Sequence, residues 1–214
     1  MSFRAVIFDM DGLLLDSERV GLDVMHDCGL LQGYDIPVSM VRQTIGSNKQ
    51  SSSDYYHQFF PGLDTDRLFL DFKEAMCGLA RQGKIPLKKG ARELLEEVRR
   101  QKLPMAVASS SGRETIGTYL ESAGVLTYFD ALITGNGLPS KPAPDIFLKA
   151  AETLGAKPEA CLVLEDSING IKAGRAAGMT VVMVPDMFPY TSDLAPYVDH
   201  TVPDLSAVIP LLQP

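Results

Sequence analysis

Short apolar runs alternate with amphipathic stretches of helical length over most of this 214-residue chain. Glycines at positions 124, 155 and 178 follow the last apolar position of three of these stretches, as expected where helices end. The alternation predicts an α/β fold, a doubly wound sheet of parallel strands joined by helices. Five apolar runs are typical of its buried strands: Ala5–Phe8, Met105–Ala108, Ala131–Thr134, Cys161–Leu164 and Thr180–Val184.

The alternation stops between about Asp16 and Pro86, where helical spacing dominates and the sequence offers no convincing strand. We interpret this block as an all-helical (all-α) insertion. Because it follows the first strand directly, we expect it to lie over the carboxyl edge of the sheet, where ligands bind in open α/β folds. We therefore predict a Rossmann-like core made of residues 1–15 and 86–214, and a helical cap made of residues 16–85.

Composition and charge exclude several classes of function. Hydrophobic residues make up 45% of the chain, enough to bury a core, and 27 acidic against 20 basic residues give a net charge of −7. With no local basic patch, this charge opposes binding to nucleic acid or to an anionic membrane. The apolar run near the N-terminus is too short for a signal peptide, and no later stretch approaches the length of a membrane span. We expect a cytoplasmic protein.

Cysteines and histidines give no sign of a metal or disulfide framework. The three cysteines, Cys28, Cys77 and Cys161, are odd in number and lack CxxC spacing, which favours reduced, buried thiols. The three histidines are scattered without metal-ligand spacing.

Carboxylates and hydroxyls follow the predicted strands. Asp9 and Asp11 come directly after the first strand, and Gly12 then releases the backbone. Ser109 and Ser110 follow the second strand, just before a helix that begins near Arg113, where hydroxyls and free amides can form an anion site. Each feature alone is equally well explained by solvated loop carboxylates or by a serine helix cap.

Two further strand ends carry reactive side chains. Lys141 lies between Ser140 and Pro142, and a rigid turn there would fix its ammonium where it could bind phosphate. Glu165 and Asp166 follow the fourth strand and offer oxygens to a hard cation. In a parallel sheet all these ends meet at one edge, so the conjunction predicts a single site.

These residues resemble the four ordered motifs of the haloacid dehalogenase superfamily. The strings FDMDGLLLDSE, SKPAPDIF and LEDSINGIKAG are similar to those of its helical-cap subgroup, which contains β-phosphoglucomutase and sugar-phosphate phosphatases. The resemblance covers essentially the whole chain.

The resemblance implies a magnesium-dependent enzyme acting on a small phosphorylated metabolite, a sugar phosphate or a nucleotide-like monophosphate. Asp9 would be the nucleophile that forms an aspartyl phosphate, and Asp11 the general acid and then base. Mg²⁺ would be held by the Asp9 carboxylate, the Asp11 carbonyl and Asp166, with Glu165 behind these ligands. Phosphate would be bound by Ser109, Ser110 and Lys141.

Phosphatase and phosphomutase share all of these residues. In our alignment this chain has Gly21 and Lys49 where the mutase has a histidine and an arginine, which favours the phosphatase. A dehalogenase is disfavoured because its chemistry needs neither Asp11 nor Asp166. A non-enzymatic alternative, a phospho-Asp receiver domain, is about half this length and has no cap.

Substrate choice depends on the cap. Asp16, Glu18, Asn48 and Lys49 are candidate contacts there, although we expect each to be an ordinary solvated side chain. Near the C-terminus, Val198–Val202 is a further strand candidate, and the apolar segment Leu205–Leu212 is expected to close the sheet.

Overall fold

The computed structural model describes residues 3–213, and six parallel strands form one sheet within them. The five predicted strands are present with ends within one residue of those expected, which confirms the doubly wound α/β fold. In sheet order the strands are β3 (Ala131–Thr134), β2 (Met105–Ser109), β1 (Ala5–Phe8), β4 (Cys161–Glu165), β5 (Thr180–Met183) and β6 (His200–Thr201).

The strand order reverses at β1, which lies between β2 and β4. A reversal of this kind leaves a crevice at the carboxyl ends of the strands. The register pairs Phe8 with Val107 of β2 on one side and with Leu164 of β4 on the other. The residues that follow these three therefore come out at one edge of the sheet.

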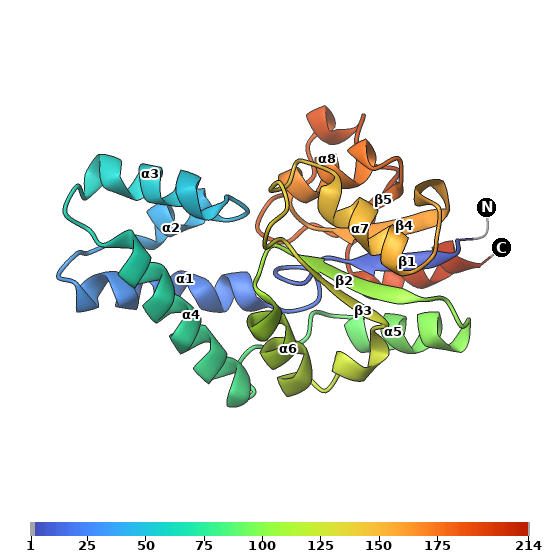
Figure 1. Ribbon diagram of the computed structural model, residues 1–214, viewed down its shortest axis with the longest axis horizontal. Coiled ribbons are helices and arrows are strands. Elements are labelled where there is room, and N and C mark those ends of the chain that lie inside the picture. The colour runs from blue at the N-terminus through green and yellow to red at the C-terminus, as the bar shows by residue number, and fades with distance from the viewer. Residues whose placement is uncertain (1–2, 214) are drawn as a thin grey trace.

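Helices cover both faces of the sheet (Figure 1): α5 (Ala91–Arg100) and α6 (Arg113–Ser122) lie on one, α7 (Asp145–Thr153) and α8 (Ile168–Ala176) on the other. Because side chains alternate along a strand, Val6 and Phe8 pack in the same apolar cluster as the α5 and α6 side chains. Ala5 and Ile7 pack with those of α7 and α8. Both faces of β1 are thus buried, as its continuous apolar run predicts.

Four helices separate β1 from α5 in the described chain. They are α1 (Ser17–Leu31), α2 (Val38–Thr44), α3 (Lys49–Phe59) and α4 (Thr65–Arg81), and we call them the helical block. The block lies to one side of the sheet in Figure 1 and has its own apolar cluster around Tyr56 and Leu68.

The chain enters and leaves the helical block through two segments that lie side by side. The Asp16 amide donates to the Pro86 carbonyl at 2.9 Å, and the Lys88 amide donates to the Leu14 carbonyl at 2.9 Å. The predicted domain boundaries fall at these crossings, and we propose that residues 16–85 form a cap domain. α4 also packs against α6, so the cap also contacts the core away from the crossings. Residues 1, 2 and 214 of the predicted core lie outside the described residues.

In the C-terminal region the predicted strand is shorter than expected. The strand expected over Val198–Val202 shortens to the two residues of β6, and Leu205–Leu212 forms a 3-10 helix, η4, whose Leu205 and Val208 are buried in the core. The remaining 3-10 helices are η1 (Leu126–Tyr128), η2 (Pro158–Ala160) and η3 (Ser192–Leu194).

The three cysteines are free and buried within the described part of the chain, as predicted. Burial raises the pKa of Cys161 to about 11, so its thiol keeps its proton at neutral pH. Among residues 3–213, none of the helices combines the length and the apolar character needed to cross a membrane.

Candidate active site

Lys141 lies at the centre of the charged groups at the carboxyl edge of the sheet. Its Nζ donates to Asp9 Oδ1 at 2.5 Å, to Glu165 Oε1 at 2.7 Å and to the Ala108 carbonyl at 3.2 Å. Its side chain is only 8% exposed. Although burial alone would lower the pKa of Lys141, Asp9 and Glu165 hold it above its ordinary value. Lys141 therefore stays charged beside the predicted nucleophile.

Asp9 is buried at the end of β1, where its amide donates to the Leu164 carbonyl at 3.0 Å. Burial raises the pKa of its carboxyl from 3.8 to about 7, against the opposing effect of Lys141 and with a further rise from Glu165 and Asp11. A carboxylate at this position needs positive charge nearby to remain ionised.

Both carboxylate oxygens of Glu165 accept hydrogen bonds from the protein. Oε1 accepts from Lys141, and Oε2 accepts from the Asp166 amide at 3.0 Å and from the amide and hydroxyl of Ser167, both at 2.9 Å. Helix α8 approaches so closely that a Cβ on Gly170 would lie 1.7 Å from Glu165 Oε1. This geometry suits the predicted role of Glu165, which is to hold neighbouring groups such as Lys141 in place without binding the metal itself.

Three hydroxyls surround the Asp11 carboxylate. Ser17 Oγ donates to Oδ1 at 2.7 Å, while Ser109 Oγ at 3.2 Å and Ser111 Oγ at 3.1 Å donate to Oδ2. The Ser111 amide in turn donates to Ser109 Oγ at 3.0 Å. Ser17 and Ser111 are absent from our sequence prediction, although Ser111 directly follows the two predicted serines in the chain.

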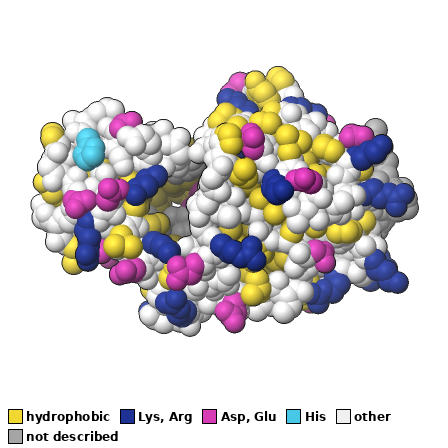
Figure 2. Space-filling model, viewed as in Figure 1, with side chains coloured by type: hydrophobic (Ala, Val, Ile, Leu, Met, Phe, Trp, Pro, Cys, Tyr) yellow, Lys and Arg dark blue, Asp and Glu magenta, His cyan; other side chains and the backbone are white. Residues whose placement is uncertain are grey.

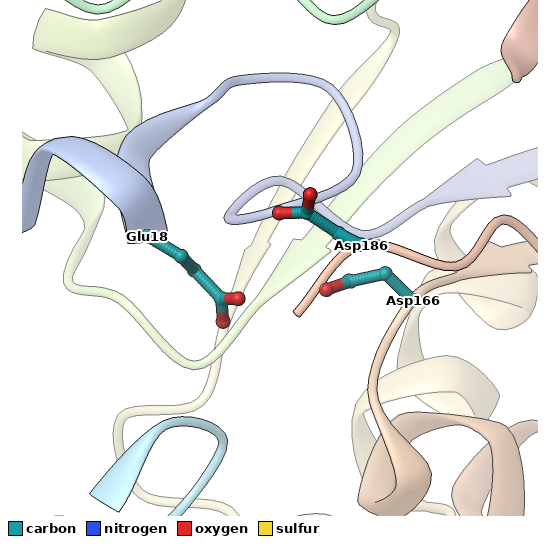
Figure 3. A group of neighbouring side chains, drawn as sticks. All are labelled: Glu18, Asp166 and Asp186. Carbon is teal, nitrogen blue, oxygen red and sulfur yellow. The ribbon is translucent and has the colours of Figure 1, made fainter. Parts of the chain in front are cut away.

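Three further carboxylates gather beside Asp9, from separate segments of the chain. Glu18 belongs to the first turn of α1, Asp166 follows β4, and Asp186 lies after β5; Figure 3 shows their side chains converging. One oxygen from each lies within 4.8 Å of the others. Both oxygens of Asp166, Glu18 Oε2 and Asp186 Oδ2 are buried without a hydrogen-bond partner in residues 3–213.

These unsatisfied oxygens fit a hard divalent cation, because buried anionic oxygens are costly unless a positive charge or a donor meets them. Burial, reinforced by the neighbouring carboxylates, raises the pKa of Glu18 to about 9 and that of Asp166 well above its ordinary range. The expectation that Glu18 is a solvated side chain is wrong. Glu18 is among the candidate cap contacts of the sequence analysis, but nothing there indicated its place in a carboxylate cluster, whereas Asp186 follows a strand end like the other site residues.

A cavity of about 640 Å³ lies between the helical block and the sheet edge, and Figure 2 shows the surface hollowed there. Asp9, Asp11, Ser109, Ser110 and Lys141 line it on the sheet side. The opposite wall belongs to the helical block and combines apolar side chains, among them Leu22, Phe69 and Phe72, with polar ones, among them Asn48, Lys49 and Lys73. The predicted nucleophile, acid and phosphate-binding residues therefore line one cavity.

The model of the haloacid dehalogenase-like hydrolase family matches residues 3–178. The chain belongs to this family. Hexitol phosphatase B of Escherichia coli is 34% identical over 190 residues, covering 85% of this chain and 83% of the relative. The probable pseudouridine-5'-phosphatase of Drosophila melanogaster is 33% identical over 187 residues, covering 84% and 80%. This chain is therefore an enzyme of the haloacid dehalogenase type with phosphatases among its relatives.

The crystal structure of β-phosphoglucomutase from Clostridium difficile is similar in fold. It is 22% identical and gives a TM-score of 0.79, covering 96% of this chain and 93% of that one. The likeness confirms the predicted resemblance to the β-phosphoglucomutase-like fold.

The other candidate cap contacts lie near the cavity or at the crossings. Asn48 caps α3 by accepting from the Ser51 amide at 2.9 Å, and Lys49 forms an exposed ion pair with Asp66 at 2.7 Å. Both residues line the cavity. Asp16 instead lies at the crossing segments, 3.4 Å from Lys88 Nζ.

Proposed function

We propose that this member of the haloacid dehalogenase-like hydrolases is a magnesium-dependent phosphatase. It would hydrolyse a small phosphorylated metabolite, a sugar phosphate or a nucleotide-like monophosphate, through an aspartyl phosphate on Asp9. The observation that carries the proposal is the buried Asp9, paired with Lys141, on the floor of the cavity beside oxygens suited to a cation. The phosphatases among its relatives support the same reaction class.

Charge neutralisation comes first, because a phosphomonoester dianion repels a carboxylate nucleophile. A bound Mg²⁺ would supply positive charge to the phosphate oxygens, and the residues that would hold it are Asp9, the Asp11 carbonyl and Asp166. Lys141 would add a fixed ammonium, held by Glu165. Ser109 Oγ and the Ser110 amide would donate to the transferring phosphoryl group.

Asp9 would attack phosphorus in line, and the bond from phosphorus to the leaving oxygen would break. Asp11 would give its proton to that oxygen. In the second step Asp11 would take a proton from water, which attacks phosphorus and frees Asp9 as inorganic phosphate leaves. The three hydroxyls around Asp11 suit this role because they fix the orientation of its carboxyl group.

The phosphatase is favoured over the mutase by the space around Gly21. A Cβ at this position would lie 3.2 Å from the Phe72 ring, so the histidine expected of a mutase would displace Phe72. Two phosphatases among the relatives, at 33% and 34% identity, support the same choice. The receiver-domain alternative loses support because the hydrolase family spans residues 3–178.

A substrate panel tests the proposal. Phosphate release is measured from sugar phosphates, polyol phosphates and nucleoside monophosphates, with Mg²⁺ or with a chelator, and conversion of β-glucose 1-phosphate to glucose 6-phosphate is followed in parallel. We expect release that requires Mg²⁺, without isomerisation. Isomerisation without release would instead establish the mutase, and Asp9→Asn serves as the inactive control.

A further inference from the structure

The cluster of Glu18, Asp166 and Asp186 contains more anionic oxygen than the protein itself satisfies. Asp166 is 1% exposed, and neither of its oxygens has a hydrogen-bond partner within the described chain. The side chain of Asp186 is also 1% exposed. A buried carboxylate is normally paired or bound to a metal, so these unpaired oxygens suit a bound cation.

The basic side chains near the cluster do not pair with these oxygens. Lys88 Nζ at 2.6 Å and an Arg19 guanidinium nitrogen at 2.5 Å both contact Asp186 Oδ1. The other oxygen, Oδ2, has no partner among residues 3–213. Lys141 is occupied by Asp9 and Glu165. Lys88, Arg19 and Lys141 therefore leave the unpaired oxygens of the three carboxylates without a positive partner.

The backbone also keeps this space open. Gly12 has a φ of +83°, and a Cβ there would lie 2.4 Å from Asp166 Oδ2 and 3.0 Å from Glu18 Oε2. A side chain at position 12 would intrude between the first strand end and the two carboxylates. Glycine satisfies both the left-handed turn and the close approach.

We propose that Glu18 and Asp186 belong to the divalent-cation site together with Asp166, so that the bound cation ties the first turn of α1 to the sheet. Figure 3 shows the geometry that supports this: Glu18 reaches from the helical block, while Asp166 and Asp186 extend from segments that follow strands. The proposal rests on the proposed function in assigning Mg²⁺ to this site, but its test needs no substrate.

The cation would therefore bind where the helical block joins the core. Ser17, the residue before Glu18, donates to Asp11, and Arg19, the residue after it, contacts Asp186. Lys88, on the returning segment, contacts the same Asp186 oxygen. A cation bound to Glu18 would hold α1 at this junction and limit the movement of the helical block.

The experiment is Mg²⁺ titration by calorimetry, combined with hydrogen exchange of the α1 amides, on the full chain without substrate. We expect Glu18→Gln and Asp186→Asn each to weaken Mg²⁺ binding at least about 10-fold, the lower end for residues that support a metal site. Mg²⁺ should slow exchange in the first turns of α1 in the wild type but not in Glu18→Gln. Asp23→Asn, at an exposed position on the same helix, is the matched control and should behave as wild type.

Glu18→Asp keeps the negative charge but shortens the side chain by one methylene group, so it tests whether the position of the carboxylate matters and not only its charge. It also provides a second variant if Glu18→Gln does not fold. It should also weaken Mg²⁺ binding. Wild-type Mg²⁺ affinity in the folded Glu18 and Asp186 variants, with binding lost only in Asp166→Asn, would overturn the proposal. Since the titration uses no phosphate ester, a failed substrate panel would leave its result unaffected.

Discussion

At the scale of single residues, the site depends on one buried ammonium between two buried carboxylates. Lys141 forms ion pairs with both Asp9 and Glu165, and its Nζ also lies 4.8 Å from the centre of the Phe147 ring. Removing one partner from such a group is costly because the remaining charges lose their compensation without regaining water. The same residue would thus serve both the stability of the fold and the proposed binding of phosphate.

Lys141→Met should lower the free energy of unfolding by about 3–5 kcal/mol, the usual cost of leaving buried charges unpaired. Urea denaturation in the presence of a chelator measures this. Lys149→Met removes an exposed lysine paired with Glu152 and should change the free energy by less than about 1 kcal/mol. Equal effects of the two substitutions would contradict the central position of Lys141.

The acidic residues also predict how stability depends on pH when no cation is bound. Burial raises the pKa of Glu18 from 4.5 to about 9 and that of Asp9 from 3.8 to about 7. The folded protein holds these protons more tightly than the unfolded chain. Each group therefore contributes stability that is fully present below its ordinary pKa and is lost as the pH rises to the folded value.

We expect the Tm in chelator to fall as the pH rises from about 5 to about 9, since both groups lose their protons over this range. Saturating Mg²⁺ should reduce the fall, because a cation favours the ionised carboxylates. Glu18→Gln should remove part of the slope. A Tm in chelator that climbs steadily over the same range would contradict the assignment.

At the scale of elements, the ends of the strands could be predicted because each strand is a continuous apolar run that can be recognised by itself. Continuous apolar runs identified the five strands, and parallel pairing alone brings Asp9, Ser109 and Asp166 to one edge. Glu18 was not predictable in this way. It lies in a helix, and its place in the site depends on how the helical block meets the sheet, which no local pattern encodes.

The contact between α8 and β4 gives a prediction at this scale. Gly170→Ala should destabilise the protein by about 1–3 kcal/mol, because the new Cβ overlaps the Glu165 carboxylate. Gly117→Ala is the matched control, since nothing lies within 4 Å of its Cβ in α6. That change should stabilise the protein by about 0.5–1 kcal/mol. Thermal unfolding of both variants measures the contrast, and destabilisation by both would count against the close approach of α8.

At the scale of the whole molecule, the sheet edge and the helical block line opposite sides of one cavity. The sheet edge presents the groups that suit a phosphoryl group, whereas the helical block presents the aromatic rings of Phe69 and Phe72 beside polar side chains. The leaving group should therefore contact the block. Sequence alone indicated that the block lies over the sheet edge, but its wall residues became evident only from the packing of α1, α2 and α4.

Phe72→Ala should lower kcat/KM for the best substrate of the panel roughly 10-fold, since it removes apolar contact with the leaving group. Competitive inhibition by inorganic phosphate should stay unchanged, because the residues proposed to bind phosphate all lie at the sheet edge. Steady-state kinetics with both ligands checks this. Equal weakening of substrate and phosphate would show that Phe72 supports the fold of the site rather than the leaving group.

The central claim, that Asp9 accepts the phosphoryl group, is tested most directly by rapid acid quench with the best substrate carrying radiolabelled phosphorus. We predict a protein-bound label that survives acid, is lost in mild alkali, maps to Asp9 and is absent in Asp9→Asn. Phosphate released at the same rate with no label on the protein, or with the label on another residue, would contradict the account.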